Sequence, residues 1–170
     1  SWPSNANGKY IGNVTVKYAI EHSLNTVPVK LLEKLGSSKS FDFLVNKLKF
    51  KNLDRSADSG SASLALGQSS KGITLRELTG GYTIFSNGIM SKPRSYFKVT
   101  DSNGRIILDN TANQEKVISS ENAAIMTKLL EGVIEDGTAR GYISLDERIS
   151  VAGKTGTTQG NCDRFFIGYT

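Results

Sequence analysis

The chain has 170 residues, 38% of them hydrophobic and 22% charged, which is the composition of a globular domain with enough apolar side chains for a core. Its 21 basic and 16 acidic residues give a net charge of +5, and no run of about 18 apolar residues is present, which excludes a membrane-spanning helix in this stretch. One cysteine and one histidine exclude an intrachain disulfide, a zinc site built on cysteines and an H-E-x-x-H protease.

Turn-forming residues dominate the first twelve positions, which we expect to form a loop. Thr15 is a natural N-cap, and the apolar residues after it predict a helix to about His22. Ser23-Leu24-Asn25 interrupts this helix with two turn-formers. A second helix should then run to Gly36, since glycine commonly stands just past a helix end.

The next segments alternate between helix and loop. Ser40 is expected to cap a short helix, and the small polar residues of 54–63 predict a loop. Thr74 and Glu77 have the spacing of a capping box, which predicts a helix that ends near Gly88.

The second half of the chain adds strands to this pattern. Residues 94–99 and 105–108 predict a hairpin around the turn-forming Asp101-Ser102-Asn103-Gly104. A long amphipathic helix should begin after Ser119 or Ser120 and stop at Gly137.

Two further strands are expected over 149–157 and 164–169, joined by a turn at Gly160-Asn161. Helices followed by a hairpin, a helix and strands indicate an α+β fold. The sequence stops inside a strand-like run at Thr170, so we expect the domain to continue beyond it.

The first candidate site is the strand-like run Val151–Thr158, in which two glycines flank Lys154 and three threonines follow. Glycine inside a strand often marks the close approach of a ligand, and a lysine beside hydroxyls suits a carboxylate. The same pattern also fits a Gly/Thr-rich edge strand with an exposed lysine.

The second candidate is Ser23-Leu24-Asn25, which by itself reads as a helix cap. Together with Lys154-Thr155-Gly156 it supplies two of the three motifs S-x-x-K, S-x-N and K-T-G, in the order found in penicillin-binding proteins and class A β-lactamases. The chain resembles the transpeptidase domain of penicillin-binding proteins, most closely the bifunctional class A kind. Further stretches that carry the resemblance are 7–10 (NGKY), 81–88 (GYTIFSNG), 135–139 (EDGTA) and 163–170 (DRFFIGYT).

The resemblance implies roles for the matching residues. Lys154, Thr155, Gly156 and Thr157 would form the edge strand of the cleft, where the lysine and the threonine hydroxyls hold the terminal carboxylate of a D-Ala-D-Ala stem peptide or a β-lactam. The backbone N–H of Thr157 would supply one arm of an oxyanion hole.

The resemblance also implies that Ser23, helped by Lys154, passes a proton to the leaving-group nitrogen, and that Asn25 hydrogen-bonds the acyl amide of the substrate. Leu24 is expected to pack rather than react. No metal or cofactor is implied.

The nucleophile is where the sequence departs from the family. No Ser-x-x-Lys precedes Ser23, and the one formal match, Ser95 to Lys98, lies in a predicted strand rather than at a helix start, so we interpret Ser95 as structural. We therefore expect residues 1–170 to be the carboxy-terminal part of a transpeptidase domain, inactive alone.

These features predict an incomplete α+β fold of the β-lactamase/transpeptidase type, with an antiparallel sheet flanked by helices and 1–170 as part of one domain. The parent protein would be a serine-type D-Ala-D-Ala transpeptidase or carboxypeptidase of peptidoglycan biosynthesis that β-lactams inactivate. It would sit on the extracytoplasmic face of the bacterial membrane through an upstream anchor. Nucleic acid is not an expected partner, and a truncated sheet with open edges could pair with a second copy.

Two alternatives bear on this interpretation. A serine β-lactamase needs a deacylating glutamate, and the acidic residues between 33 and 77 show no Glu-x-x-x-Asn pattern. A non-catalytic module that senses cell-wall peptide or β-lactam would explain the missing nucleophile, although the presence of Ser23, Asn25 and Lys154 argues against it. A Ser-x-x-Lys upstream in the parent protein would distinguish an enzyme from such a module.

Overall fold

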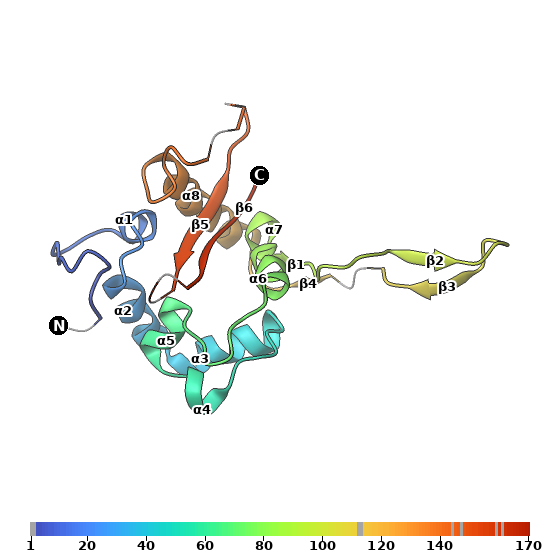
Figure 1. Cartoon of the computed structure of the whole chain (residues 1–170), viewed down its shortest axis with the longest axis horizontal. Coiled ribbons are helices and arrows are strands. Elements are labelled where there is room, and N and C mark those ends of the chain that lie inside the picture. Colours follow the sequence, from blue (N-terminus) through green and yellow to red (C-terminus); the bar gives the residue numbers. More distant parts are fainter. Residues whose placement is uncertain (1–2, 112–113, 144, 147, 159, 161) are drawn as a thin grey trace.

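The computed structural model describes residues 3–111, 114–143, 145–146, 148–158, 160 and 162–170. Within these ranges short helices pack around the long helix α8, the strand pair β5–β6 lies on the outer side of this body, and a narrow arm that carries the hairpin of residues 98–109 projects from it (Figure 1). The helices are α1 (Val16–Glu21), α2 (Thr26–Leu35), α3 (Ser37–Asp42), η1 (Phe43–Lys47), α4 (Arg55–Asp58), α5 (Ser61–Leu66), α6 (Leu75–Tyr82), α7 (Ile84–Asn87) and α8 (Ser120–Glu135). The strands are β1 (Ile89–Met90), β2 (Lys98–Thr100), β3 (Ile106–Asp109), β4 (Glu115–Lys116), β5 (Ala152–Thr157) and β6 (Arg164–Tyr169).

The expected α+β character is confirmed, and the described strands form three separate antiparallel pairs, β1–β4, β2–β3 and β5–β6. The sequence patterns did not predict β1 and β4, which are two residues long each. Within the described part of the chain, none of the helices combines the length and the apolar character needed to cross a membrane.

The first two helices lie where the sequence places them. Thr15 caps α1, because its hydroxyl accepts a hydrogen bond from the Tyr18 N–H at 3.1 Å. The helix α2 ends at Gly36, whose φ of 97° is a conformation that favours glycine. The break between the two helices, at residues 22–25, is therefore confirmed.

The predicted start of the third helix is wrong by four residues, since a cap at Ser40 would begin the helix at Phe41. Helix α3 begins at Ser37, directly after the turn at Gly36, and Ser40 lies inside it. The Ser40 hydroxyl donates back to the Gly36 carbonyl at 3.1 Å instead of capping a helix start.

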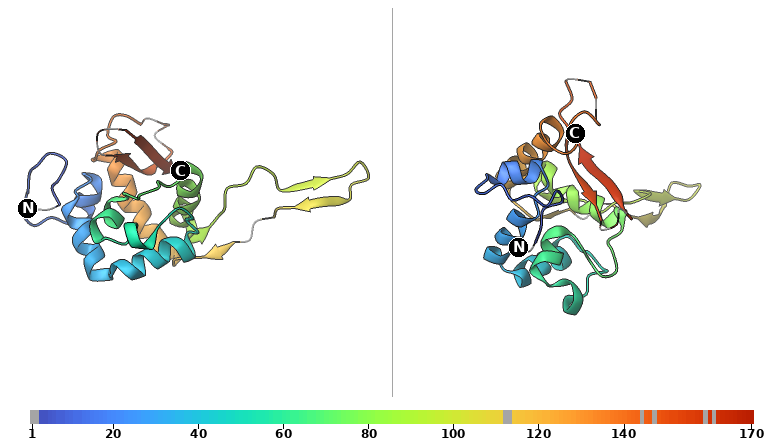
Figure 2. Two further views of the ribbon diagram at one scale, coloured as in Figure 1. Left: turned by 60° about the horizontal axis from the view of Figure 1, so that its bottom comes forward. Right: turned by 60° about the vertical axis from the view of Figure 1, so that its left-hand side comes forward.

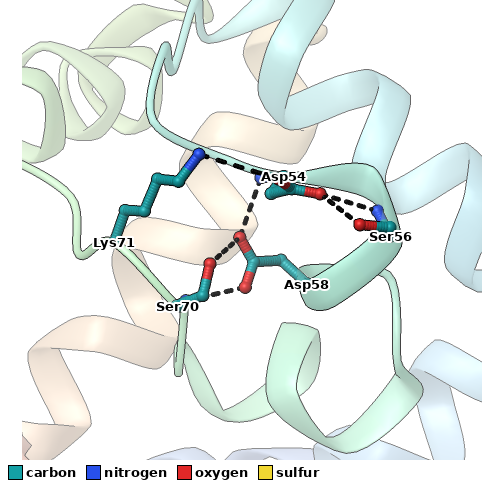
Figure 3. A network of polar contacts seen from close by, with 5 residues as sticks. All are labelled: Asp54, Ser56, Asp58, Ser70 and Lys71. Atoms are coloured by element: carbon teal, nitrogen blue, oxygen red, sulfur yellow. Dashed lines mark hydrogen bonds and ion pairs between the residues drawn. The ribbon is translucent and has the colours of Figure 1, made fainter.

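The loop expected over 54–63 is also wrong, since α4 and α5 form there. Asp54 caps α4 by accepting the Ser56 N–H at 2.9 Å. The buried carboxylate of Asp58 accepts the backbone N–H groups of Asp54 at 2.8 Å and Ser70 at 2.7 Å, and Lys71 lies 3.6 Å from Asp54 (Figure 3). These contacts fold the polar segment onto the body, where α5 packs against α2.

The capping box at Thr74 and Glu77 is confirmed, with both reciprocal hydrogen bonds present. The predicted helix is interrupted at Thr83, whose hydroxyl donates to the Gly80 carbonyl at 2.7 Å, and α7 follows to Gly88. A core cluster of Leu48, Phe50 and Ile84 lies under this region.

The predicted hairpin of β2 and β3 is confirmed, with Asp101 accepting the N–H groups of Asn103 and Arg105 at 2.9 Å in its turn. Its first strand is shorter than predicted, so Ser95 lies ahead of the strand and not within it. The arm extends away from the body in every view (Figures 1 and 2).

The long helix α8 begins after Ser119, whose hydroxyl accepts the Asn122 N–H at 3.2 Å, as the sequence predicts. It buries Leu130 and Val133 almost completely, and full burial of such a side chain contributes about 1.5–3 kcal/mol. Strand β5 packs along this helix and pairs with β6 from Ala152 to Thr157, three residues later than the predicted start. Asn161, expected in the connecting turn, lies outside the described residues.

Candidate active site

The two sequence motifs meet at one point of the molecule. The Nζ of Lys154 on β5 donates a hydrogen bond to the Oγ of Ser23 between α1 and α2, at 2.9 Å. These residues are 131 positions apart in the chain, so their meeting depends on the tertiary fold. An amine and a hydroxyl at this distance can exchange a proton directly.

Ser23 is held in an unusual backbone conformation. Its φ of 53° lies in the left-handed region, where a residue other than glycine costs about 1–3 kcal/mol and is often found at functional sites. The turn is fixed by the Leu24 N–H, which donates to the Ala19 carbonyl at 2.9 Å. As expected, Leu24 is buried and packs, whereas Ser23 stays exposed.

Asn25 does not cap α2 with its side chain. Instead its Nδ2 donates to the Ser4 backbone carbonyl at 2.8 Å, while the side-chain Oδ1 of Asn5 accepts the backbone N–H groups of Asn25 at 2.9 Å and Thr26 at 3.4 Å. The Oδ1 of Asn25 accepts no hydrogen bond from the described residues, which leaves it open to a ligand. The buried Asn5 thus takes the capping role and fixes the Ser-x-Asn turn.

Lys154 is a half-buried cation. Burial holds the pKa of its ammonium below the usual value of 10.5. It donates to the Thr155 carbonyl at 3.0 Å, and no carboxylate among the described residues lies within ion-pair distance of it. A cation with no counter-ion in a partly buried position is suited to binding an anionic group.

The strand around Lys154 is shaped by its glycines. A Cβ on Gly153 would come within 2.7 Å of Phe166 Cε2 and 2.8 Å of the Ile167 carbonyl, so only glycine fits under this ring. Gly156 has no atom within 4 Å of an added Cβ, and Gly156 and Thr157 are exposed at the end of β5. The backbone of this end of the strand is therefore accessible to a ligand.

Thr138 contributes to the site although sequence reasoning gave it no role. Its hydroxyl lies 2.6 Å from that of Thr155, and its N–H donates to the Glu21 carbonyl at 3.0 Å. Asn5 was missed as well, because it stands in a segment that reads only as a loop. The resemblance of residues 135–139 to the family was the one available signal for Thr138.

The formal Ser-x-x-Lys match does not join this site. Ser95 lies three residues ahead of β2, next to Tyr96, whose carbonyl accepts a hydrogen bond from Asn110 at 3.2 Å. Lys98 lies 3.7 Å from Asp109 of the paired strand.

Within the described residues, no group of three or more histidine, cysteine or acidic side chains could hold a metal ion.

Comparison with known proteins agrees with this geometry. The sequence-family model of the penicillin-binding protein transpeptidase domain matches residues 1–170. Penicillin-binding protein 1A of Clostridium novyi (strain NT) is 36% identical over 99% of this chain and 20% of its own length, and that of Aquifex aeolicus is 38% identical over 99% and 22%. The chain thus spans about a fifth of the length of these curated relatives.

Solved structures share the fold at lower identity. The D,D-transpeptidase domain of a peptidoglycan glycosyltransferase from Eggerthella lenta has a TM-score of 0.75 and 23% identity, over 97% of this chain and 47% of that one. Penicillin-binding protein A from M. tuberculosis, solved as an imipenem acyl-enzyme complex, also has a TM-score of 0.75, with 18% identity over 97% of this chain and 41% of that one. The chain belongs to the penicillin-binding protein transpeptidase domain family.

Proposed function

We propose that residues 1–170 are part of a single D,D-transpeptidase domain, which transfers the acyl group of a D-Ala-D-Ala stem peptide through a serine acyl-enzyme in peptidoglycan synthesis. The observation that carries this proposal is the 2.9 Å hydrogen bond from Lys154 to Ser23. It supports a proton path between two motifs that the family shares.

Ser23 and Lys154 act together in proton transfer. When the peptide bond to the terminal D-Ala breaks, the Ser23 hydroxyl donates its proton to the leaving nitrogen, and Lys154 replaces that proton. The lowered pKa of Lys154 favours this step, because a buried ammonium gives up its proton more readily than an exposed one.

The remaining site residues bind the substrate. Lys154 and the hydroxyls of Thr155 and Thr157 hold the terminal carboxylate, and the open Gly156 lets the peptide approach the strand. The N–H of Thr157 stabilises the developing oxyanion, while Asn25 bonds the acyl amide. A β-lactam with its own carboxylate would occupy the same positions.

The nucleophile is assigned to a Ser-x-x-Lys serine outside these 170 residues. Two facts support this assignment: Ser95 and Lys98 lie on the arm, and the chain spans only about a fifth of the related penicillin-binding proteins 1A. The whole protein would act on the outer face of the bacterial cell membrane, through an anchor elsewhere in it, and a glycosyltransferase domain would accompany it if it is of class A.

The test is the intact mass of the full-length protein after incubation with a labelled penicillin. We expect one adduct per protein, formed at least about 100-fold more slowly in Lys154→Ala and Ser23→Ala. Lys98→Ala is the matched lysine control, and both it and Ser95→Ala should react like the wild type.

Each outcome separates the candidate functions. Loss of the adduct in Ser95→Ala would place the nucleophile at Ser95 and overturn the assignment. A full-length protein that binds penicillin reversibly without an adduct would instead be a non-catalytic sensing module.

A further inference from the structure

Thr138 connects the two halves of the candidate site. Its backbone N–H donates to the carbonyl of Glu21, the last residue of α1, at 3.0 Å. Its hydroxyl lies 2.6 Å from the hydroxyl of Thr155, beside Lys154. One residue therefore touches both the helix that leads to Ser23 and the strand that carries Lys154.

The turn that holds Thr138 is itself well anchored. The Ala139 N–H donates to the Val133 carbonyl at 3.0 Å, and Ala139 is almost fully buried. The Arg140 N–H donates to the Gly137 carbonyl at 3.2 Å, which closes the turn. Thr138 thus presents its hydroxyl from a fixed backbone.

The hydroxyl pair can be ordered in two ways. A threonine hydroxyl has one hydrogen to donate and two lone pairs, and Thr138 and Thr155 share a single hydrogen between them. If Thr155 donates to Thr138, it has no hydrogen left for a ligand. If Thr138 donates, the Thr155 hydrogen remains available.

Lys154 fits the second arrangement, and a bound carboxylate favours it, because only there does Thr155 keep a hydrogen for the anion. Its Nζ lies 3.4 Å from the Thr155 Oγ1 as a donor, so this oxygen can accept from both Lys154 and Thr138. With both lone pairs engaged, the Thr155 O–H points away from these two donors. An anion near Lys154 would be the natural acceptor for it.

We infer that Thr138 is a positioning residue for carboxylate recognition: its hydroxyl donates to Thr155 and so directs the Thr155 O–H toward the ligand carboxylate. This inference rests on the proposed function, because it concerns the same carboxylate. It adds the expectation that the preference for a charged carboxylate over an ester depends on a residue outside the three family motifs.

The experiment compares acylation of the full-length protein by benzylpenicillin and by its methyl ester. Thr138→Val removes the hydroxyl at nearly constant volume, and Thr138→Ser keeps it. Thr127→Val is the matched control, because it also removes a threonine hydroxyl from a hydroxyl pair. That pair joins α8 to Tyr169 of β6 at 2.7 Å, and Tyr169 lies opposite Ala152, the first residue of β5.

In Thr138→Val we expect the second-order rate with benzylpenicillin to fall about 3- to 10-fold, the range of one exposed hydrogen bond, with little change for the ester. Thr138→Ser should restore the wild-type ratio of the two rates, and Thr127→Val should keep it. An unchanged ratio in Thr138→Val, or an equal fall with both compounds, would overturn the inference while leaving the proposed function intact.

A second measurement needs no reaction. In labelled protein, the χ1 angle of Thr155 should average between rotamers in Thr138→Val and stay in one rotamer in the wild type and Thr138→Ser, as its methyl couplings report. One rotamer in all three would overturn the inference. A wild type that forms no adduct yet shows this rotamer pattern would overturn the proposed function alone.

Discussion

A close backbone contact between α1 and the residues that follow α8 leads to a sharp prediction at Gly137. A Cβ at this position would overlap the Glu21 carbonyl oxygen and would lie 2.8 Å from Val133 Cα and 2.9 Å from the Glu21 carbonyl carbon. Ordinary van der Waals contact begins at 3.4 Å, so Gly137→Ala leaves a shortfall of 3.4 − 2.8, or about 0.6 Å, even to Val133. All three atoms belong to backbone, which cannot rotate away as a side chain would.

The expected cost has two parts. Forcing one extra carbon into a packed site typically costs about 1–3 kcal/mol. Moving α1 away from Gly137 also weakens the hydrogen bond from the Thr138 N–H to Glu21, worth about 0.5–1.5 kcal/mol. We therefore expect Gly137→Ala to lower the free energy of unfolding by about 2–4 kcal/mol.

Urea unfolding of the purified protein measures this loss, and hydrogen exchange of the Thr138 and Ala139 amides locates it at the end of α8. Gly60→Ala is the matched control, because an added Cβ there meets no atom within 4 Å and φ is negative, at −65°. It should cost less than about 1 kcal/mol. Equal stability of Gly137→Ala and Gly60→Ala would refute the argument that α1 and α8 are held together by this close approach.

Three further changes test other parts of the fold. Asp58→Ala should lower the free energy of unfolding by about 2–4 kcal/mol in urea unfolding, because two backbone N–H groups lose their acceptor. These hydrogen bonds, first that from Asp54, hold the pKa of Asp58 below its usual value of 3.8. The stabilisation by the Asp58 carboxylate is therefore present above pH 3.8 and is lost as the pH falls through the lowered pKa of the folded protein. A wild type that keeps its stability in acid as well as Asp58→Asn does would contradict this. Burial raises the pKa of Tyr82 to about 12, so its phenol ionises in the unfolded chain at a lower pH than in the folded protein. The free energy of unfolding should therefore fall between pH 10 and 12, by about 1.4 kcal/mol at pH 11, and Tyr82→Phe should remove that fall in the same assay. Asn5→Ala should lower the melting temperature and slow penicillin acylation, because α2 loses a cap worth about 1 kcal/mol, and an unchanged acylation rate would show that Asn5 does not position Asn25.

Local chemistry in the sequence determined much of the secondary structure. The caps at Thr15, Thr74 and Ser119 each join a side chain to an N–H three residues away, so the sequence alone contains both partners. The glycines at 36 and 88 have positive φ values that end their helices in the same local way. The order of the Ser-x-Asn and Lys-Thr-Gly motifs likewise sufficed to predict the family.

The tertiary structure decided what distant residues do together. Asp58 accepts a hydrogen bond from Ser70, twelve residues away, and this contact, which no local pattern contains, helps to fold a polar segment onto the body. The contacts of Lys154 with Ser23, and of Thr138 with Thr155, join turns next to helices to strand β5, across 131 and 17 residues of the chain. Such pairs depend on how elements pack and not on any spacing in the sequence, which is why the motifs were predictable and their hydrogen bonds were not.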